Sequence, residues 1–140
     1  SKKMALLLST DDWDKLKVQK EYLKKHPPKT IWRTRQRYTP EYLKQIRYPL
    51  TLYFFHRSIV RACAHCIGIA SIPAASHRVE NVPPEFHDDL TPYSIFIEID
   101  KIDYVSATHI SEFRKWDDPE AFFDRGQFGL LKVIDKFASE

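Results

Sequence analysis

Nine prolines and only three glycines set the strongest limits on how this 140-residue chain can fold. Proline interrupts helices and strands because it lacks a backbone N–H donor, so the prolines mark the boundaries between short elements. The glycines, Gly68, Gly126 and Gly129, are too few and too scattered to form a glycine-rich phosphate-binding loop. Rossmann and P-loop nucleotide-binding folds are therefore excluded.

Between the prolines, apolar residues follow short strand and helix patterns. Residues 93–102 alternate most clearly, with Ile95, Ile97 and Ile99 on one face, which predicts a half-buried strand. Further strands are predicted over residues 4–8, 30–34, 50–56 and 59–72, the last two as a hairpin. Helices are predicted over residues 11–25, from residue 39 and over 118–123, with a helix or turn over 106–113. The remaining segments are a long loop over 73–92 and an apolar stretch over 130–137 that fits a strand or a last helix.

This order of elements predicts an α+β protein, with a curved sheet or small β-barrel flanked by helices. The length fits one domain over residues 1–140, in which residues 1–3 are interpreted as an addition ahead of a native Met4. No window holds the roughly 18 apolar residues that a membrane helix needs. Two cysteines without an export signal favour a reducing compartment, so a cytoplasmic location is expected.

No cluster of residues carries an enzyme signature. Residues 63–66, with the sequence CAHC, contain a CxxC pair, but a second ligand pair at zinc spacing is missing. Two buried core cysteines are therefore predicted. Neighbouring acids such as Asp11 and Asp12 fit helix caps or turns better than a catalytic carboxylate dyad. The chain is predicted to be non-catalytic, without a metal or cofactor.

Basic and aromatic residues interleave in a stretch that reads WRTRQRY. Arg33, Arg35 and Arg37 occupy every second position, so in an extended chain they lie on one face. A row of arginines beside Trp32 and Tyr38 suits phosphate contacts next to a stacking surface, and a solvated sheet face fits the pattern equally well. Trp32 itself fits either a core residue or the wall of an aromatic cage. The net charge of +3 is compatible with a polyanionic partner.

Four stretches, taken in order, resemble those of the YTH and EVE modified-base readers of the PUA-like superfamily. LSTDD at residues 8–12 resembles the polar segment after the first strand of YTH domains. IWRT at residues 31–34 resembles the stretch that carries their first cage tryptophan. LYFFH at 52–56 followed by CIGIA at 66–70 resembles a hairpin of both families, and GQFGLLKV at 126–133 resembles their closing stretch. The resemblance implies a PUA-like curved sheet or small β-barrel flanked by helices.

The resemblance also implies a pocket for a modified base. In it, Trp32 is the first cage wall, and Arg33 offers its backbone carbonyl to the methylated amine. Asp12 contacts the base edge. The second family tryptophan belongs within residues 73–92, where this chain has no Trp, and Phe86 is the nearest aromatic substitute. The other implied pocket residues are Tyr93, at the place of the third cage residue, and Ser9 and Thr10. Trp13, which follows the two acids, either lines the pocket or belongs to the core.

Phosphate contacts are expected from basic residues around this pocket. His56 and Arg57 occupy the predicted hairpin tip, where EVE domains keep a His-Ser pair near the ligand. Arg35 and Arg37 continue the basic row that follows Trp32. The full set of phosphate candidates is Arg35, Arg37, His56, Arg57, Arg114, Lys115 and Arg125.

The expected function is recognition of N6-methyladenine flipped into an aromatic pocket, with methylated DNA favoured over RNA. Related modules occur in McrB-type restriction enzymes, so the chain is expected to be the targeting domain of a modification-dependent restriction system. It would then be fused to, or assembled with, a larger nucleotide-hydrolysing and nuclease machinery in a prokaryote. The alternatives are an N6-methyladenine RNA reader, a 5-methylcytosine reader, an ASCH-like RNA-processing hydrolase, and a protein-interaction domain whose aromatic residues are all core.

Overall fold

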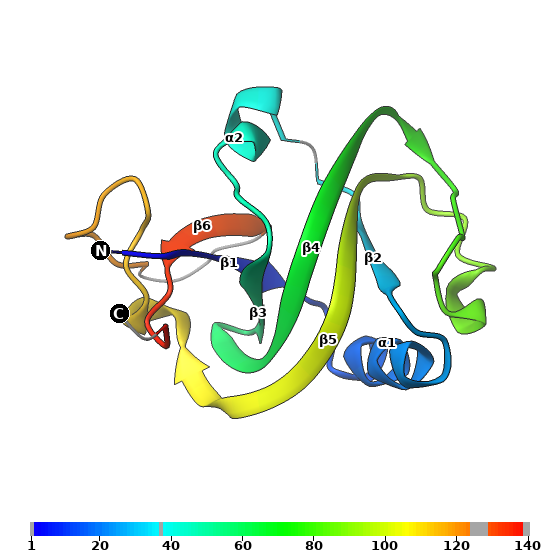
Figure 1. Cartoon of the computed structure of the whole chain (residues 1–140), viewed down its shortest axis with the longest axis horizontal. Coiled ribbons are helices and arrows are strands. Elements are labelled where there is room, and N and C mark those ends of the chain that lie inside the picture. Colours follow the sequence, from blue (N-terminus) through cyan, green and yellow to red (C-terminus); the bar gives the residue numbers. More distant parts are fainter. Residues whose placement is uncertain (1, 37, 124–128, 139–140) are drawn as a thin grey trace. The chain divides into compact units, whose positions relative to one another are not determined.

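The computed structural model describes residues 2–36, 38–123 and 129–138. Backbone hydrogen bonds join six strands in the order β2-β5-β4-β3-β1-β6. Along the chain (Figure 1) the elements are β1 (Met4–Ser9), α1 (Asp14–Lys25), β2 (Thr30–Thr34), α2 (Pro40–Lys44), β3 (Leu50–His56), β4 (Ile59–Ser76), the 3₁₀ helix η1 (Pro84–Phe86), β5 (Tyr93–His109), the 3₁₀ helix η2 (Ile110–Glu112) and β6 (Leu130–Ile134).

The chain is an α+β protein with one six-stranded mixed sheet, which confirms the predicted class. Strand β1 pairs in parallel with β3 and antiparallel with β6, and its residues from Ala5 to Leu8 are all buried. A strand that is covered on both faces reads as a continuous apolar run, as this one does. Strands β2 and β6 stand at opposite ends of the order and do not pair within the described residues. The sheet is therefore open, and the closed small barrel that was the alternative expectation is not formed.

The predicted hairpin joins β3 to β4 through Arg57 and Ser58. Both residues have a positive φ, 51° and 69°, as a tight two-residue hairpin turn requires. Non-glycine residues seldom adopt this region, so the turn is held against some strain. The N–H of Ile110 donates to the carbonyl of Ser58 at 2.9 Å and helps to fix it.

Two strands are longer than the sequence pattern predicts. Strand β4 continues to Ser76, beyond Pro73, and β5 continues to His109 instead of ending near residue 102. Asp100, Lys101 and Asp103 are exposed and break the apolar alternation of β5, so the pattern placed its end too early. Residues 106–109 are strand, and only the next three residues form a helical turn.

The helix predicted over residues 118–123 is wrong. The N–H of Ala121 donates to the carbonyl of Asp118 at 2.9 Å, which closes a turn, and Phe122 pairs with Arg114 in an isolated bridge. The Asp-Pro start that suggested a helix suits a turn equally well. In the ambiguous segment over residues 130–137, residues 130–134 form β6, because β1 offers them an antiparallel partner.

Packing divides the chain into two compact units that share the strands β4 and β5. The first unit comprises Ser1–Trp13, Leu50–Ala64 and Ile102–Glu140. Alternate residues of β1 and β3 supply much of its core. The buried cluster of this unit is Ala5, Leu7, Tyr53, Phe55, Val60, Ile110, Phe113, Phe123 and Val133.

The second unit comprises Asp14–Pro49 and His65–Lys101. Helix α1 lies beside β2, with Leu16, Gln19 and Leu23 buried. A polar contact fixes the pair: Gln19 Nε2 donates to the carbonyl of Ile31 at 3.2 Å, and Thr30 Oγ1 donates to Gln19 Oε1 at 2.6 Å. A small core of Ile31, Val82, Tyr93 and Phe96, flanked by Ile72 and Phe86, lies between β2, β5 and the loop of residues 77–92.

Candidate functional site

Three aromatic side chains of the second unit gather around one ammonium group. The Nζ atom of Lys15 lies 4.3 Å from the ring centroid of Trp32 and 5.9 Å from the centroids of both Phe86 and Tyr93. These distances fall within the roughly 6 Å over which an aromatic face attracts a cation. We call Trp32, Phe86 and Tyr93 the aromatic cage. Its walls come from β2, η1 and the start of β5, and its occupant from the first turn of α1.

The cage wall on the long loop is held in place by Arg33. This arginine is only 4% exposed. Its Nη1 donates to the carbonyl of Arg78 and its Nη2 to the carbonyl of Phe86, both at 3.0 Å, and its guanidinium lies 4.5 Å from the Tyr93 centroid. The side chain thus ties the loop at two points and supports two of the three cage walls. The sequence interpretation assigned Arg33 a role through its backbone carbonyl and did not anticipate this clamp.

The Tyr93 wall of the cage is held in place by the carboxylate of Asp89. The hydroxyl of Tyr93 donates to Asp89 Oδ2, and the N–H of Thr91 donates to Asp89 Oδ1 at 2.9 Å. Hydrogen bonds from Thr91 and Tyr93 lower the pKa of Asp89 to about 2. Burial, and then the hydrogen bond to Asp89, raise the pKa of Tyr93. At neutral pH the acid is therefore ionised, the phenol keeps its proton, and the ring is held in one orientation.

Trp32 is only 3% exposed, which by itself indicates a core residue. One observation favours the cage interpretation: the Lys15 ammonium lies over the Trp32 ring, and a charged group is seldom found in an apolar core. The ammonium of Lys15 thus covers one face of the Trp32 ring.

The other predicted pocket residues form a separate group in the first unit. The hydroxyl of Ser9 accepts from the N–H of Gly129 at 2.9 Å, and Thr10 Oγ1 donates to the carbonyl of Asp12 at 2.9 Å. His56 Nδ1 lies 2.8 Å from the carbonyl of Thr10, and Trp13 meets His56 edge-on with centroids 6.3 Å apart. The structure thus brings Trp32, Arg33, Phe86 and Tyr93 together in one unit, and Ser9, Thr10, Asp12, Trp13 and His56 in the other.

The predicted phosphate residues are dispersed. Arg35 and Arg57 are exposed, the first just after β2 and the second in the β3–β4 turn. Arg114 donates to the carbonyl of Pro119 at 3.3 Å, and Lys115 lies 5.3 Å from the ring of Phe123. Both of these side chains make local contacts within the first unit. Arg37 and Arg125 lie outside the described residues.

Residues 14–47 form a strongly basic segment that the sequence interpretation did not identify. The segment of residues 14–47, which carries both Lys15 and Trp32, has three acids, Asp14, Glu21 and Glu41. The same segment holds eleven basic residues: Lys15, Lys17, Lys20, Lys24, Lys25, Lys29, Arg33, Arg35, Arg37, Lys44 and Arg47. The overall charge of +3 conceals this excess, because acids are concentrated elsewhere in the chain. A count by segment would have found it.

The CxxC pair lies on β4, and neither cysteine forms a disulfide. Cys66 is buried as predicted, but Cys63 is only partly buried, so the prediction of two buried cysteines is wrong for Cys63. No group of three or more His, Cys, Asp or Glu side chains in the described residues is arranged to hold a metal ion. None of the helices in this part of the chain has the length and apolarity needed to cross a membrane. Comparison of the chain with protein-family models, curated proteins and solved structures found no match. A functional assignment therefore rests on the residues of this chain.

Proposed function

We propose that this chain is a non-catalytic binding module that recognises a modified base in nucleic acid, with the aromatic cage as its pocket. The modification that we favour is N6-methyladenine. The observation that carries the proposal is the convergence of Trp32, Phe86 and Tyr93 on the ammonium of Lys15. Trp32 is more than 50 positions from the other two in the sequence. The resemblance to YTH and EVE readers implies Trp32 and Tyr93 as cage walls, with Phe86 as the substitute for the missing second tryptophan.

The physical chemistry of such a site suits a base that has been flipped out of its stack. Unstacking costs a few kcal/mol, and an aromatic platform returns about 1–3 kcal/mol per base. Burial of a methyl group against the rings adds about 1 kcal/mol. The base would take the volume that Lys15 Nζ occupies, and the displaced ammonium would remain close to the adjoining phosphates. The basic segment of residues 14–47 supplies further cations for the strand.

The wider setting that we propose follows from the same resemblance. The open six-stranded sheet with two helices is loosely compatible with a PUA-like curved sheet. We assign the module to methylated DNA in a prokaryotic cytoplasm, as the targeting part of a McrB-type restriction system. The nucleotide hydrolysis and the nuclease activity of that system would reside in other domains or subunits.

The test is a fluorescence-anisotropy titration at fixed salt, with matched oligonucleotides that differ only in N6-methyladenine, as DNA and as RNA. A 5-methylcytosine pair is the chemical control. We expect a preference of about fivefold for the methylated adenine strand, which corresponds to about 1 kcal/mol from the burial of one methyl group in an aromatic pocket. Absence of discrimination for every modification would refute the proposal.

A pair of tryptophan variants links that preference to the cage. Trp32→Ala should reduce the affinity for the methylated strand by about 1–3 kcal/mol, because one stacking face is lost. Trp116→Ala, which changes a half-buried tryptophan of the other unit, is the matched control and should leave the preference intact. Circular dichroism of both variants shows whether they are folded. If Trp32→Ala were folded and still preferred the methylated strand, the cage would not be the pocket.

A further inference from the structure

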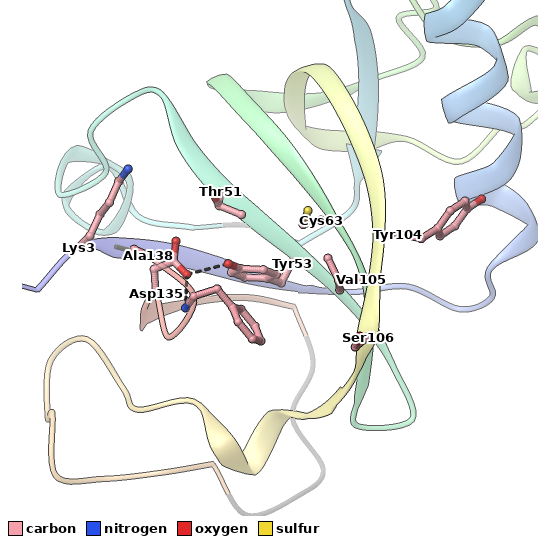
Figure 2. A pocket seen from close by; sticks show the side chains of 10 residues that line it. Lys3, Thr51, Tyr53, Cys63, Tyr104, Val105, Ser106, Asp135 and Ala138 are labelled. Carbon is pink, nitrogen blue, oxygen red and sulfur yellow. Dashed lines mark hydrogen bonds between the residues drawn. The ribbon is translucent and has the colours of Figure 1, made fainter. Parts of the chain in front are cut away.

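A hollow lies in the first unit, and none of the residues that line it belongs to the cage. It has a volume of about 750 Å³, within the range of roughly 300–1,000 Å³ that small-molecule sites occupy. Figure 2 shows its walls, which come from the N-terminal end of the chain, β3, β4, β5 and the residues that follow β6. None of the residues that line it was singled out for binding by the sequence. We call it the Asp135 pocket.

Aromatic rings form much of its wall. The ring of Tyr53 is buried, with its centroid 5.6 Å from that of Phe137 and 5.4 Å from that of Phe113. Phe137 and Tyr104, which also line the pocket, are each 52% exposed. A pocket that pairs a buried ring with half-exposed rings offers stacking surface to a flat ligand.

A single carboxylate provides the polar end of the pocket. Asp135 Oδ1 accepts from the hydroxyl of Tyr53 at 2.7 Å, the contact drawn in Figure 2, and from the N–H of Phe137 at 3.0 Å. Burial, and then Asp135 itself, raise the pKa of Tyr53, so the phenol remains a donor. Both donors are neutral, and within the described residues no Lys or Arg forms an ion pair with Asp135. The carboxylate is thus held in place through Oδ1 by two neutral donors, and a carboxylate has acceptor sites beyond these two for a ligand.

We propose that the Asp135 pocket binds a nucleotide whose base carries an exocyclic amine, that is, a cytosine or adenine nucleotide. The base would stack on the half-exposed ring of Phe137, and its amine would donate to Asp135 Oδ2. Lys3, an exposed residue that lines the same pocket, has an ammonium suited to the phosphate. A base with a carbonyl in place of the amine would direct an oxygen at the carboxylate and be rejected. This site is independent of the cage and of the function proposed for it.

The matched ligands are cytidine and uridine monophosphate, which differ at the group that would meet Asp135. Titration calorimetry with the full chain should show cytidine monophosphate binding about tenfold more tightly, as expected for a hydrogen bond to a charged acceptor. Asp135→Asn should bring the two affinities to within about threefold of each other, because an amide can either donate or accept. Cys63 also lines the pocket, so cytidine monophosphate should slow its alkylation by iodoacetamide, and uridine monophosphate should not.

Further variants keep the test decisive. If Asp135→Asn does not fold, Tyr104→Ala changes an exposed wall residue and should weaken both nucleotides alike. Trp32→Ala should leave nucleotide binding in this pocket unchanged, which separates the proposal from the cage. A cytosine-containing strand that binds more tightly than the free nucleotide would identify the strand as the natural source of the base. Equal affinity for the two nucleotides, or binding of neither at millimolar concentration, would overturn the proposal.

Discussion

Replacement of Lys15 by alanine should increase the affinity of the cage for a modified nucleoside. A cation over an aromatic face contributes about 0.5–1 kcal/mol when exposed and about 2 kcal/mol when desolvated. The Lys15 ammonium meets one ring at 4.3 Å and two at 5.9 Å, and the tryptophan beneath it is buried, so we take about 1–2 kcal/mol as the cost of displacing it. Removal of that cost should strengthen binding of free N6-methyladenosine by about 5- to 30-fold.

The assay separates the two roles that Lys15 would have. Free nucleoside lacks the flanking phosphates, so titration with it measures the displacement alone. With a methylated oligonucleotide, Lys15→Ala should gain less affinity and should lower the salt slope by about 0.7–0.9, because one phosphate contact is lost. Lys17→Ala, an exposed residue two positions further along α1, is the matched control and should leave nucleoside binding unchanged.

The outcome that would refute this reasoning is a folded Lys15→Ala variant that binds N6-methyladenosine no more tightly than the wild type. In that case the ligand does not enter the volume that Lys15 occupies. A thermal melt of each variant checks that α1 and β2 remain packed, since the methylene groups of lysine also cover apolar surface.

Three further predictions concern the supports of the cage and its approach. Arg33→Met should lower the free energy of unfolding by about 2–4 kcal/mol, because two loop carbonyls lose a charged donor. Hydrogen exchange should accelerate at residues 77–92. Unchanged exchange in this loop would contradict the role of Arg33 as a clamp. Asp89 has a lowered pKa, so its ionised form stabilises the fold above about pH 4, and that stabilisation disappears as the pH falls towards about 2. The urea midpoint of Asp89→Asn should therefore vary less over this pH interval than that of the wild type. The neighbouring variant Asp88→Asn is the control and should vary like the wild type. Arg35→Ala should weaken all strands alike and lower the salt slope, and a change in base preference instead would show that Arg35 reads the base.

Local sequence patterns predicted much of the fold. The continuous apolar run at residues 4–8 and the alternation around Ile97 both became strands, since burial leaves a direct trace in the sequence. The alternation predicted burial on one face only, but residues 93–97 are all buried, so both faces are covered there. The strand order could not be predicted in this way. The position of β1 between β3 and β6 depends on partners that are 40 or more residues distant, and no local pattern records them. The Asp-Pro start at residue 118 was misleading because helix caps and turns use the same residues.

The candidate site was also predicted only in part from the sequence. The resemblance to the modified-base readers suggested Trp32, Phe86 and Tyr93. A resemblance between sequences cannot show how far apart these side chains lie. Lys15 was missed because a lysine in the first turn of a helix has the same sequence pattern whether it faces solvent or an aromatic ring. Its direction is decided by the packing of α1 on β2, which places the neighbouring Leu16 in the core. The clamp by Arg33 was missed for a similar reason, since it depends on the path of a long loop.

In the proposed function, displacement of Lys15 would lower the affinity of the cage without changing its selectivity. The cost of displacing Lys15 is the same for methylated and unmethylated adenine, so it lowers both affinities by one factor and leaves their ratio unchanged. In the proposed function the ratio would be set by the contact of the methyl group with the rings, which would contribute about 1 kcal/mol. Stacking alone returns about 1–3 kcal/mol against a flipping cost of a few kcal/mol, so a further 1–2 kcal/mol places the unmodified base below useful binding. Lys15→Ala should therefore raise the affinity for methylated and unmethylated nucleosides equally, and a variant with a changed ratio would show that Lys15 contacts the methyl group or the base.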